Sequence, residues 1–120
     1  MLTPMLTRDT LCNHSCQPQH GSACTSEQVI QQLQALPDWQ CLDNTLCRNY
    51  HFKNYYETMA FVNALVFMVH RQDHHPELRV HYNICEVRYN THSVNGITLN
   101  DFICAAKTDA IFGTTTFETE

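Results

Sequence analysis

The sequence predicts an α+β fold, a four-stranded antiparallel sheet with helices packed on one face, in the order α-β-β-α-β-β-α. Apolar residues recur at helical spacing in three segments, and two pairs of shorter segments between them have the pattern of strands. Each pair is typical of a hairpin, because only a few residues separate its two members. Hairpins that alternate with helices bury their apolar sides against one another, which gives an α+β domain.

Three helices are expected, at residues 25–36, 54–71 and 98–113. Each begins with a polar residue followed three positions later by Gln, Glu or Asp, which is the spacing of a capping box. Pro37 ends the first helix because the residue before a proline is pushed out of the helical region, and Gly113 closes the last. The middle helix has a wide apolar face that we expect to pack on the sheet. This face consists of Tyr55, Met59, Val62, Val66 and Val69, widened by Phe61, Leu65 and Met68.

Four strands are expected, at residues 39–42, 45–52, 78–82 and 85–89. Asp43-Asn44 is a short polar turn between the first two strands. Residues 78–82 and 85–89 alternate between apolar and polar side chains, as strands do that have one face buried and the other in water.

Residues 25–120 are expected to form one domain, preceded by a poorly ordered tail at residues 1–24. The tail shows no apolar period and contains prolines, a glycine and many small polar residues, so we expect it to be dispensable for folding and activity. A metal site in the tail is an open alternative, although the spacing of its ligands matches no common zinc module. Those ligands would be Cys12, His14, Cys16, His20 and Cys24.

Composition excludes several functional classes. The net charge of -5 and the absence of a Lys/Arg cluster disfavour binding to nucleic acid. The longest apolar run, residues 64–69, is too short to cross a membrane. The seven cysteines cannot all pair within one chain, and the N-terminus lacks the pattern of a secretory signal. We therefore expect reduced thiols and a cytoplasmic protein.

Histidine is the unusual component, with eight residues against seven Lys and Arg together. His74 and His75 stand just before Pro76, where the long helix must end, and His92 follows the last strand, so all three can converge on one cleft. Imidazoles on two sides of a bound molecule can act as acid and base in an elimination of water. Two alternatives stay open. The histidines can simply complement a helix end, or His70, His74 and His92 can bind zinc, although the glutamate of the HExxH pattern is missing.

The residues around these histidines form a longer pattern. An Asp-His-His-Pro element is followed by an aromatic residue six positions later, then by Thr-His, and then by an Asp at the start of the last helix. These are Asp73-His74-His75-Pro76, Tyr82, Thr91-His92 and Asp101, with Trp39, His51-Phe52-Lys53 and Ala60-Phe61 upstream. In this pattern the chain resembles the pterin-4a-carbinolamine dehydratase family, over residues 25–112.

The resemblance implies a function. Members of the family remove water from 4a-hydroxytetrahydropterin to give quinonoid dihydropterin, which supports tetrahydropterin recycling for an aromatic amino-acid hydroxylase. They use no metal or organic cofactor, and they form dimers or tetramers. By resemblance His74 and His92 are the acid and base, and His75 holds the pterin and assists. The resemblance further suggests that Asp73, Pro76 and His70 contact the substrate.

One departure and two alternatives accompany the resemblance. Many family members have an acid where this chain has His70, and a histidine there supplies no fixed negative charge to tune the site. Some relatives act as dimerisation partners of transcription factors, so a non-catalytic module of the same fold is the main alternative. Binding of a different pterin, such as the molybdenum cofactor, is another.

Overall fold

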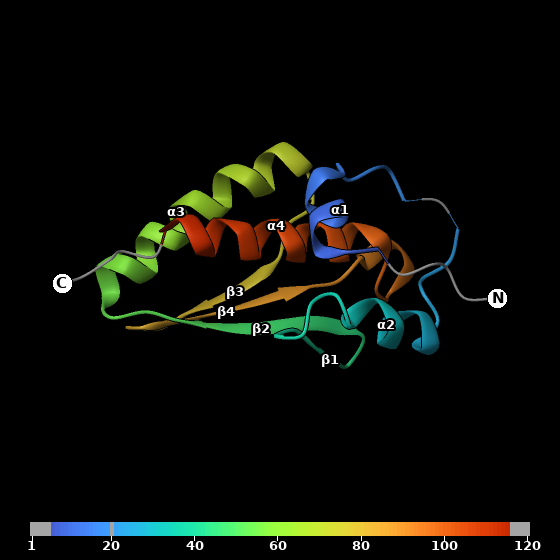
Figure 1. The fold of residues 1–120 in the computed structure, drawn as a ribbon, viewed down its shortest axis with the longest axis horizontal. Coiled ribbons are helices and arrows are strands. Elements are labelled where there is room, and N and C mark those ends of the chain that lie inside the picture. Colours follow the sequence, from blue (N-terminus) through green and yellow to red (C-terminus); the bar gives the residue numbers. More distant parts are fainter. Residues whose placement is uncertain (1–5, 20, 116–120) are drawn as a thin grey trace.

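One open antiparallel sheet forms the base of the molecule (Figure 1). The computed structural model describes residues 6–19 and 21–115. The strands are β1 (Gln40–Leu42), β2 (Thr45–His51), β3 (Glu77–Val80) and β4 (Ile84–Tyr89). They lie in the order β1-β2-β4-β3, so the two longest strands are central and the shorter ones form the edges.

The helices are α1 (Arg8–Asn13), α2 (Ser26–Leu33), α3 (Tyr55–Gln72) and α4 (Leu99–Thr115), with a short 3-10 turn, η1 (His92–Val94). In Figure 1, α3 and α4 cross the same face of the sheet, and α1 packs against α4. The predicted α+β class and the four-stranded antiparallel sheet are confirmed. The sequence did not predict α1 or η1, and α4 continues two residues beyond Gly113.

The turn between β1 and β2 is formed by Asp43 and Asn44, as predicted. Asp43 and Asn44 both have left-handed backbone angles, with φ of 51° and 57°. A two-residue hairpin turn that matches the twist of its strands needs positive φ at both positions, and Asp and Asn tolerate this conformation better than most residues. The turn therefore fixes the register in which Leu42 pairs with Thr45.

The face of β2 toward the helices carries one charged residue, Arg48, among apolar neighbours. Its guanidinium lies 2.7 Å from a carboxylate oxygen of Asp109 on α4. The indole N–H of Trp39 donates to the same oxygen at 3.0 Å, and the Tyr50 hydroxyl also donates to it. Burial, the Asp109 charge and this hydrogen bond raise the pKa of Tyr50. Asp109 thus joins α4 to the sheet, and its partners offset the cost of burying the carboxylate.

The side of α3 that faces the core differs from the predicted stripe. Phe61 and Leu65 are fully buried, whereas Tyr55 is 46% exposed and Val66 is 52% exposed. Apolar residues cover most of the circumference of this helix, so periodicity alone does not indicate which side packs. The sheet and α4 cover the side of Thr58, Phe61 and Leu65, and the neighbouring apolar side chains are partly buried against the core. The exposed apolar side chains of α3 are Tyr55, Tyr56, Val66 and Phe67.

Part of the segment expected to be a poorly ordered tail contributes to the core; residues 1–5 and 20 of that segment lie outside the described residues. Leu11 of α1 is fully buried, and Arg8 lies 3.8 Å from Asp109. The Lys107 ammonium donates to the carbonyl of Cys12 at 2.7 Å. A six-residue helix with a single buried side chain leaves no detectable period in the sequence, which explains why α1 was not predicted.

Helices α3 and α4 are the longest in the described part of the chain. No helix in that part is both long and apolar enough to cross a membrane.

Candidate active site

A cavity of about 420 Å³ opens at the end of the sheet where α3 passes into β3 and β4 passes into η1. Four segments line it. They are residues 16–19 of the N-terminal segment, residues 72–75 after α3, residues 90–93 after β4, and Asn100 at the start of α4. All four segments are loops or helix ends held on a rigid scaffold, the usual construction of a ligand site.

The end of α3 places two of the predicted histidines. Asp73 caps the helix in the left-handed conformation, with φ of 53°, and its N–H donates to the carbonyls of His70 and Val69. Pro76 then leads into β3. His74 and His75 therefore lie in the short link between α3 and β3, and both line the cavity.

Sheet register brings His92 to the same place. Strands β3 and β4 are antiparallel, and Glu77 at the start of β3 pairs with Arg88 near the end of β4. The residues just before β3 and just after β4 must therefore meet at one end of the sheet. The ring centroids of His75 and His92 are 6.4 Å apart, and both side chains are exposed at the cavity.

His74 is held more firmly than the other two histidines. Its Nε2 lies 2.5 Å from Oδ1 of Asp101, and its ring stacks on Tyr89 at a centroid distance of 6.1 Å. Asp101 is fully buried, and its other oxygen accepts from the Thr91 hydroxyl at 2.8 Å and from the N–H of Thr98 at 2.9 Å. The carboxylate is thus fixed at the N-terminus of α4 and points at one imidazole nitrogen.

Burial and charge act on His74 in opposite directions. Burial by itself lowers the pKa of His74. The hydrogen bond to Asp101 and the negative charge of Asp101, with smaller contributions from Cys16 and Asp73, oppose burial, and the pKa is raised. Asp101 therefore favours the protonated imidazole of His74. The sequence indicated Asp101 mainly as a helix cap, and in the structure it caps α4 and orients His74 at once.

The three residues predicted to bind substrate do not all line the cavity. Asp73 lines the cavity with the histidines. Pro76 lies in a neighbouring hollow that shares His75 and His92 with it. His70 is exposed on the last turn of α3 and does not line either hollow, so its contact with substrate stays a prediction.

Residues 16–19, here called the N-terminal wall, were missing from the predicted site. The N–H of Cys16 donates to the side-chain carbonyl of Gln72 at 2.8 Å. The backbone N–H of Gln17 donates to the side-chain oxygen of Asn100 at 3.0 Å, and the side-chain N–H of Asn100 donates to the backbone carbonyl of Gln17 at 2.7 Å. The wall closes one side of the cavity, and its cysteine was the only sequence signal that pointed to it.

Metal ligation was an alternative for these histidines and for the N-terminal cysteines. Within residues 6–19 and 21–115, no group of three or more His, Cys, Asp and Glu side chains is placed to hold a metal ion. His20 lies outside the described residues.

Known proteins are similar to this chain in sequence and in fold. Residues 22–111 match the family described as Pterin 4 alpha carbinolamine dehydratase, and the chain belongs to that family. A Chromobacterium violaceum protein provisionally named pterin-4-alpha-carbinolamine dehydratase is 52% identical over 99 residues, which cover 82% of this chain and 92% of the relative. A Nitrosospira multiformis protein with the same provisional name is 45% identical over 108 residues, which cover 88% of this chain and 96% of the relative.

Two solved structures are similar. A transcriptional coactivator/pterin dehydratase from Brucella melitensis has a TM-score of 0.72 and 33% identity, covering 75% of this chain and 98% of its own. A pterin dehydratase-like protein identified as a RuBisCO assembly factor in the alpha-carboxysome has a TM-score of 0.54 and 21% identity, covering 62% of this chain and 87% of its own. At 21% identity, the similarity to the second structure shows a common fold and nothing more.

Proposed function

We propose that this protein dehydrates a 4a-hydroxytetrahydropterin to quinonoid dihydropterin and so supports tetrahydropterin recycling for an aromatic amino-acid hydroxylase. The observation that carries the proposal is the arrangement of three imidazoles around one cavity, one of them oriented by a buried carboxylate. Family membership supports the same class of reaction. We place the protein in the cytoplasm, where such a hydroxylase would supply its substrate.

The reaction needs one proton donor and one acceptor. The carbinolamine hydroxyl leaves as water when it receives a proton, and the neighbouring ring nitrogen loses its proton as the carbon–nitrogen double bond forms. Asp101 stabilises the imidazolium form of His74, so His74 is the better candidate for protonating the leaving hydroxyl. His92 then accepts the ring proton, and His75 beside it holds the pterin.

A stopped-flow experiment tests this function. The 4a-hydroxy intermediate is generated by a hydroxylase, and its absorbance decay is followed with and without the purified protein. We expect faster decay with protein, in proportion to its concentration. An equal decay rate with micromolar protein and without protein would refute the dehydratase function.

A non-catalytic binding module is the second candidate. The Brucella melitensis relative is named both a transcriptional coactivator and a pterin dehydratase, and it is 33% identical to this chain. A pure binding module would bind pterin or a partner without accelerating the decay of the intermediate, so the same experiment distinguishes the two functions.

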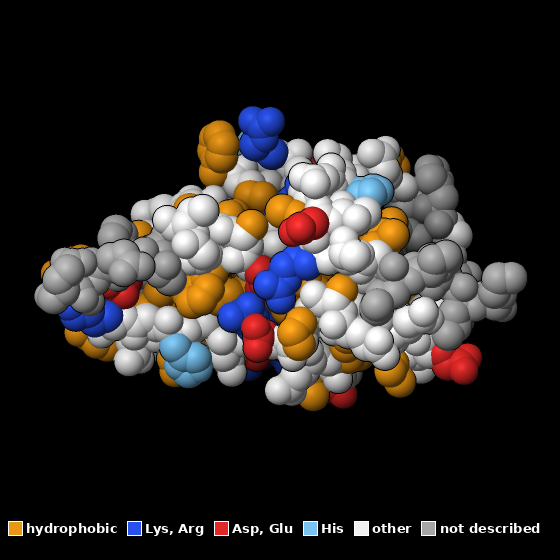
Figure 2. Space-filling view, viewed as in Figure 1, with side chains coloured by type: hydrophobic (Ala, Val, Ile, Leu, Met, Phe, Trp, Pro, Cys, Tyr) orange, Lys and Arg blue, Asp and Glu red, His pale blue; other side chains and the backbone are white. Residues whose placement is uncertain are grey.

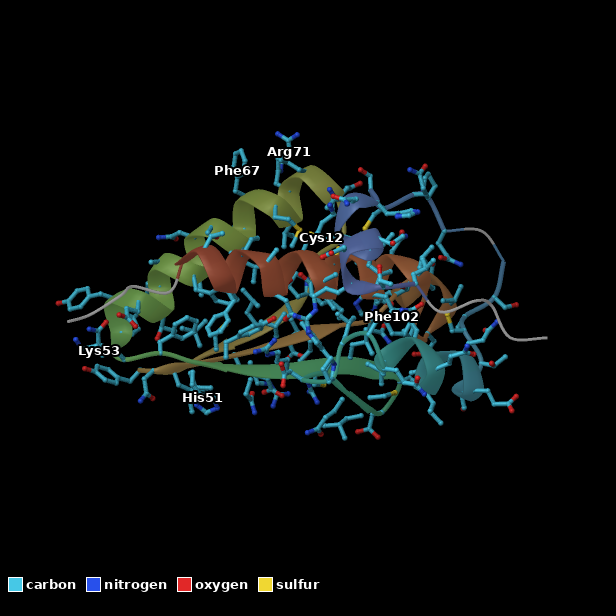
Figure 3. The ribbon with its side chains drawn as sticks, viewed as in Figure 1. Cys12, His51, Lys53, Phe67, Arg71 and Phe102 are labelled. Atoms are coloured by element: carbon cyan, nitrogen blue, oxygen red, sulfur yellow. The ribbon has the colours of Figure 1, made fainter. Side chains whose placement is uncertain are left out.

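We further propose that the protein is a homodimer or homotetramer, and that the uncovered apolar side of α3 forms the contact. Tyr56 is 83% exposed and Phe67 is 66% exposed. In Figure 3, Phe67 projects from α3 away from the body of the molecule, beside Arg71. Figure 2 shows a hydrophobic side chain standing out from that side of the surface next to a basic one. An exposed apolar patch of this kind is typical of an interaction surface.

Light scattering at micromolar concentration is expected to report two or four chain masses. Phe67→Glu should lower the measured mass, because it places a charge within the apolar contact. Gln34→Glu, a change at an exposed position at the C-terminal end of the separate helix α2, should not. A wild-type mass of one chain would contradict the proposal.

A further inference from the structure

Two thiols meet beneath the N-terminal wall. Cys16 belongs to the wall, and Cys104 lies on α4, 88 positions later in the sequence. Their sulfur atoms are 3.4 Å apart. Cys104 is fully buried, whereas Cys16 is half-buried and lines the cavity, so only Cys16 faces the solvent.

The approach of the two sulfurs is set by neighbouring contacts and does not depend on the thiols themselves. The Gln72 side chain holds the backbone of Cys16, and the paired hydrogen bonds between Gln17 and Asn100 hold the next residue. Asn100 precedes Cys104 by one helical turn, so both lie on the same side of α4. The wall is therefore fixed on the helix side that carries the second thiol, and the pair is preorganised.

The two thiols differ in character. In its neutral form Cys16 donates to the carbonyl of Asn100 at 3.6 Å, which leaves Cys104 as the donor within the pair. The hydrogen bond from Cys104 lowers the pKa of Cys16. Burial and Asp101 oppose this effect, and the positive charges of His74 and Lys107 support it. The pKa of Cys104 is raised by the same hydrogen bond and by burial.

This asymmetry is what an oxidisable pair of thiols requires. The thiolate is the reactive form of a cysteine, and the Cys16 sulfur faces the cavity. The Cys104 thiol lies next to it and is buried from solvent. For comparison, burial raises the pKa of Cys24 and raises the pKa of Cys85 to about 11.

We propose that Cys16 and Cys104 form a modification site at which a hydroperoxide produces a disulfide between the N-terminal wall and α4. The Cys16 thiolate attacks one peroxide oxygen, the S–O bond forms as the O–O bond breaks, and the other oxygen leaves with a proton as water or alcohol. The Cys104 sulfur then attacks the Cys16 sulfur, and the S–O bond breaks. The hydroxyl leaves with the Cys104 proton as water. The two thiols lose two electrons and two protons, and the peroxide gains them.

The disulfide would tie one wall of the cavity covalently to the helix that carries Asp101. It would close a loop of 88 positions, and a crosslink over a long loop restricts the unfolded chain. Oxidation should therefore raise the melting temperature of the protein. This inference concerns the thiols alone and does not depend on the dehydratase reaction.

The experiment treats the full-length reduced protein with hydrogen peroxide, quenches it with a thiol-alkylating reagent and maps the products by mass spectrometry. We expect one dominant product, a crosslinked peptide pair that contains Cys16 and Cys104 and has lost two hydrogens. A dithiol reductant should restore both free thiols and the lower melting temperature. Cys16→Ser should abolish the crosslink, and Cys104→Ala should leave a sulfenic acid on Cys16 that a 1,3-dione reagent traps.

Cys41→Ser is the matched control, since Cys41 is an exposed thiol on β1 and should leave the crosslink unchanged. The Cys16→Ser variant changes a half-buried residue, so its melting curve verifies that it is folded. Oxidation that spares Cys16, or that joins it to a cysteine other than Cys104 in the folded protein, would overturn the proposal.

Discussion

Replacing His74 or His92 with alanine is expected to lower the dehydration rate by roughly 10²-fold or more, because each variant loses one group of the acid–base pair. His75→Ala should instead raise KM more than it lowers kcat, since we assign His75 mainly to binding. The measurement is a full rate profile against pterin concentration for each variant. His81→Ala is the control, because His81 is an exposed residue beyond the end of β3. A loss in His81→Ala equal to that in His92→Ala would show that the site is wrongly assigned.

The pairing of His74 with Asp101 gives this expectation a second test. Asp101→Asn keeps the size of the side chain but removes the charge that favours the His74 imidazolium, so the rate should fall. In a His74→Ala background the same change should cost little further activity, because the two residues act as a unit. Asp101 also caps α4, and melting curves are therefore needed to separate a loss of folding from a loss of chemistry. Full additivity of the two changes would mean that Asp101 does not act through His74.

Most of the candidate site could be predicted because its signals are local in the sequence. Pro76 requires α3 to end near His74 and His75, and the alternation of residues 78–82 and 85–89 predicts the hairpin that brings His92 back to them. The resemblance to the family indicates the same three histidines. Local capping rules also predicted Asp101 at the start of α4, but no local rule connects it with His74, 27 positions earlier.

The parts that could not be predicted depend on contacts between distant segments. The packing side of α3 is decided by what the sheet and α4 cover. A helix that is apolar around most of its circumference does not indicate that side in its sequence. Helix α1 contributes one buried leucine, and the N-terminal wall is held by Gln72 and Asn100, whose roles appear only once the chain is folded. Residues 8–13 and 16–19, which were expected to belong to a poorly ordered tail, are therefore part of the core and of the cavity.

A chain that begins at Thr25 is therefore expected to melt at a lower temperature than the full chain and to bind pterin more weakly. The truncation removes the fully buried Leu11 and the N-terminal wall. Loss of a buried leucine side chain alone costs about 2–5 kcal/mol of unfolding free energy, so Leu11→Ala should reproduce much of the change in melting temperature. The sequence-based expectation was the opposite, that this segment is dispensable, and equal melting temperatures and KM for the two chains would support it.

Two further variants separate packing from substrate binding. Asn100→Ala removes the hydrogen bonds that hold Gln17 but leaves Leu11 in place, so we expect a several-fold higher KM with little change in melting temperature. A chain that begins at Leu6 keeps both Leu11 and the wall and should behave like the full chain. Melting curves with and without a chelator complete the set. A chelator-sensitive melting temperature in the full chain, absent from the chain that begins at Thr25, would mean that the segment stabilises the fold by binding metal.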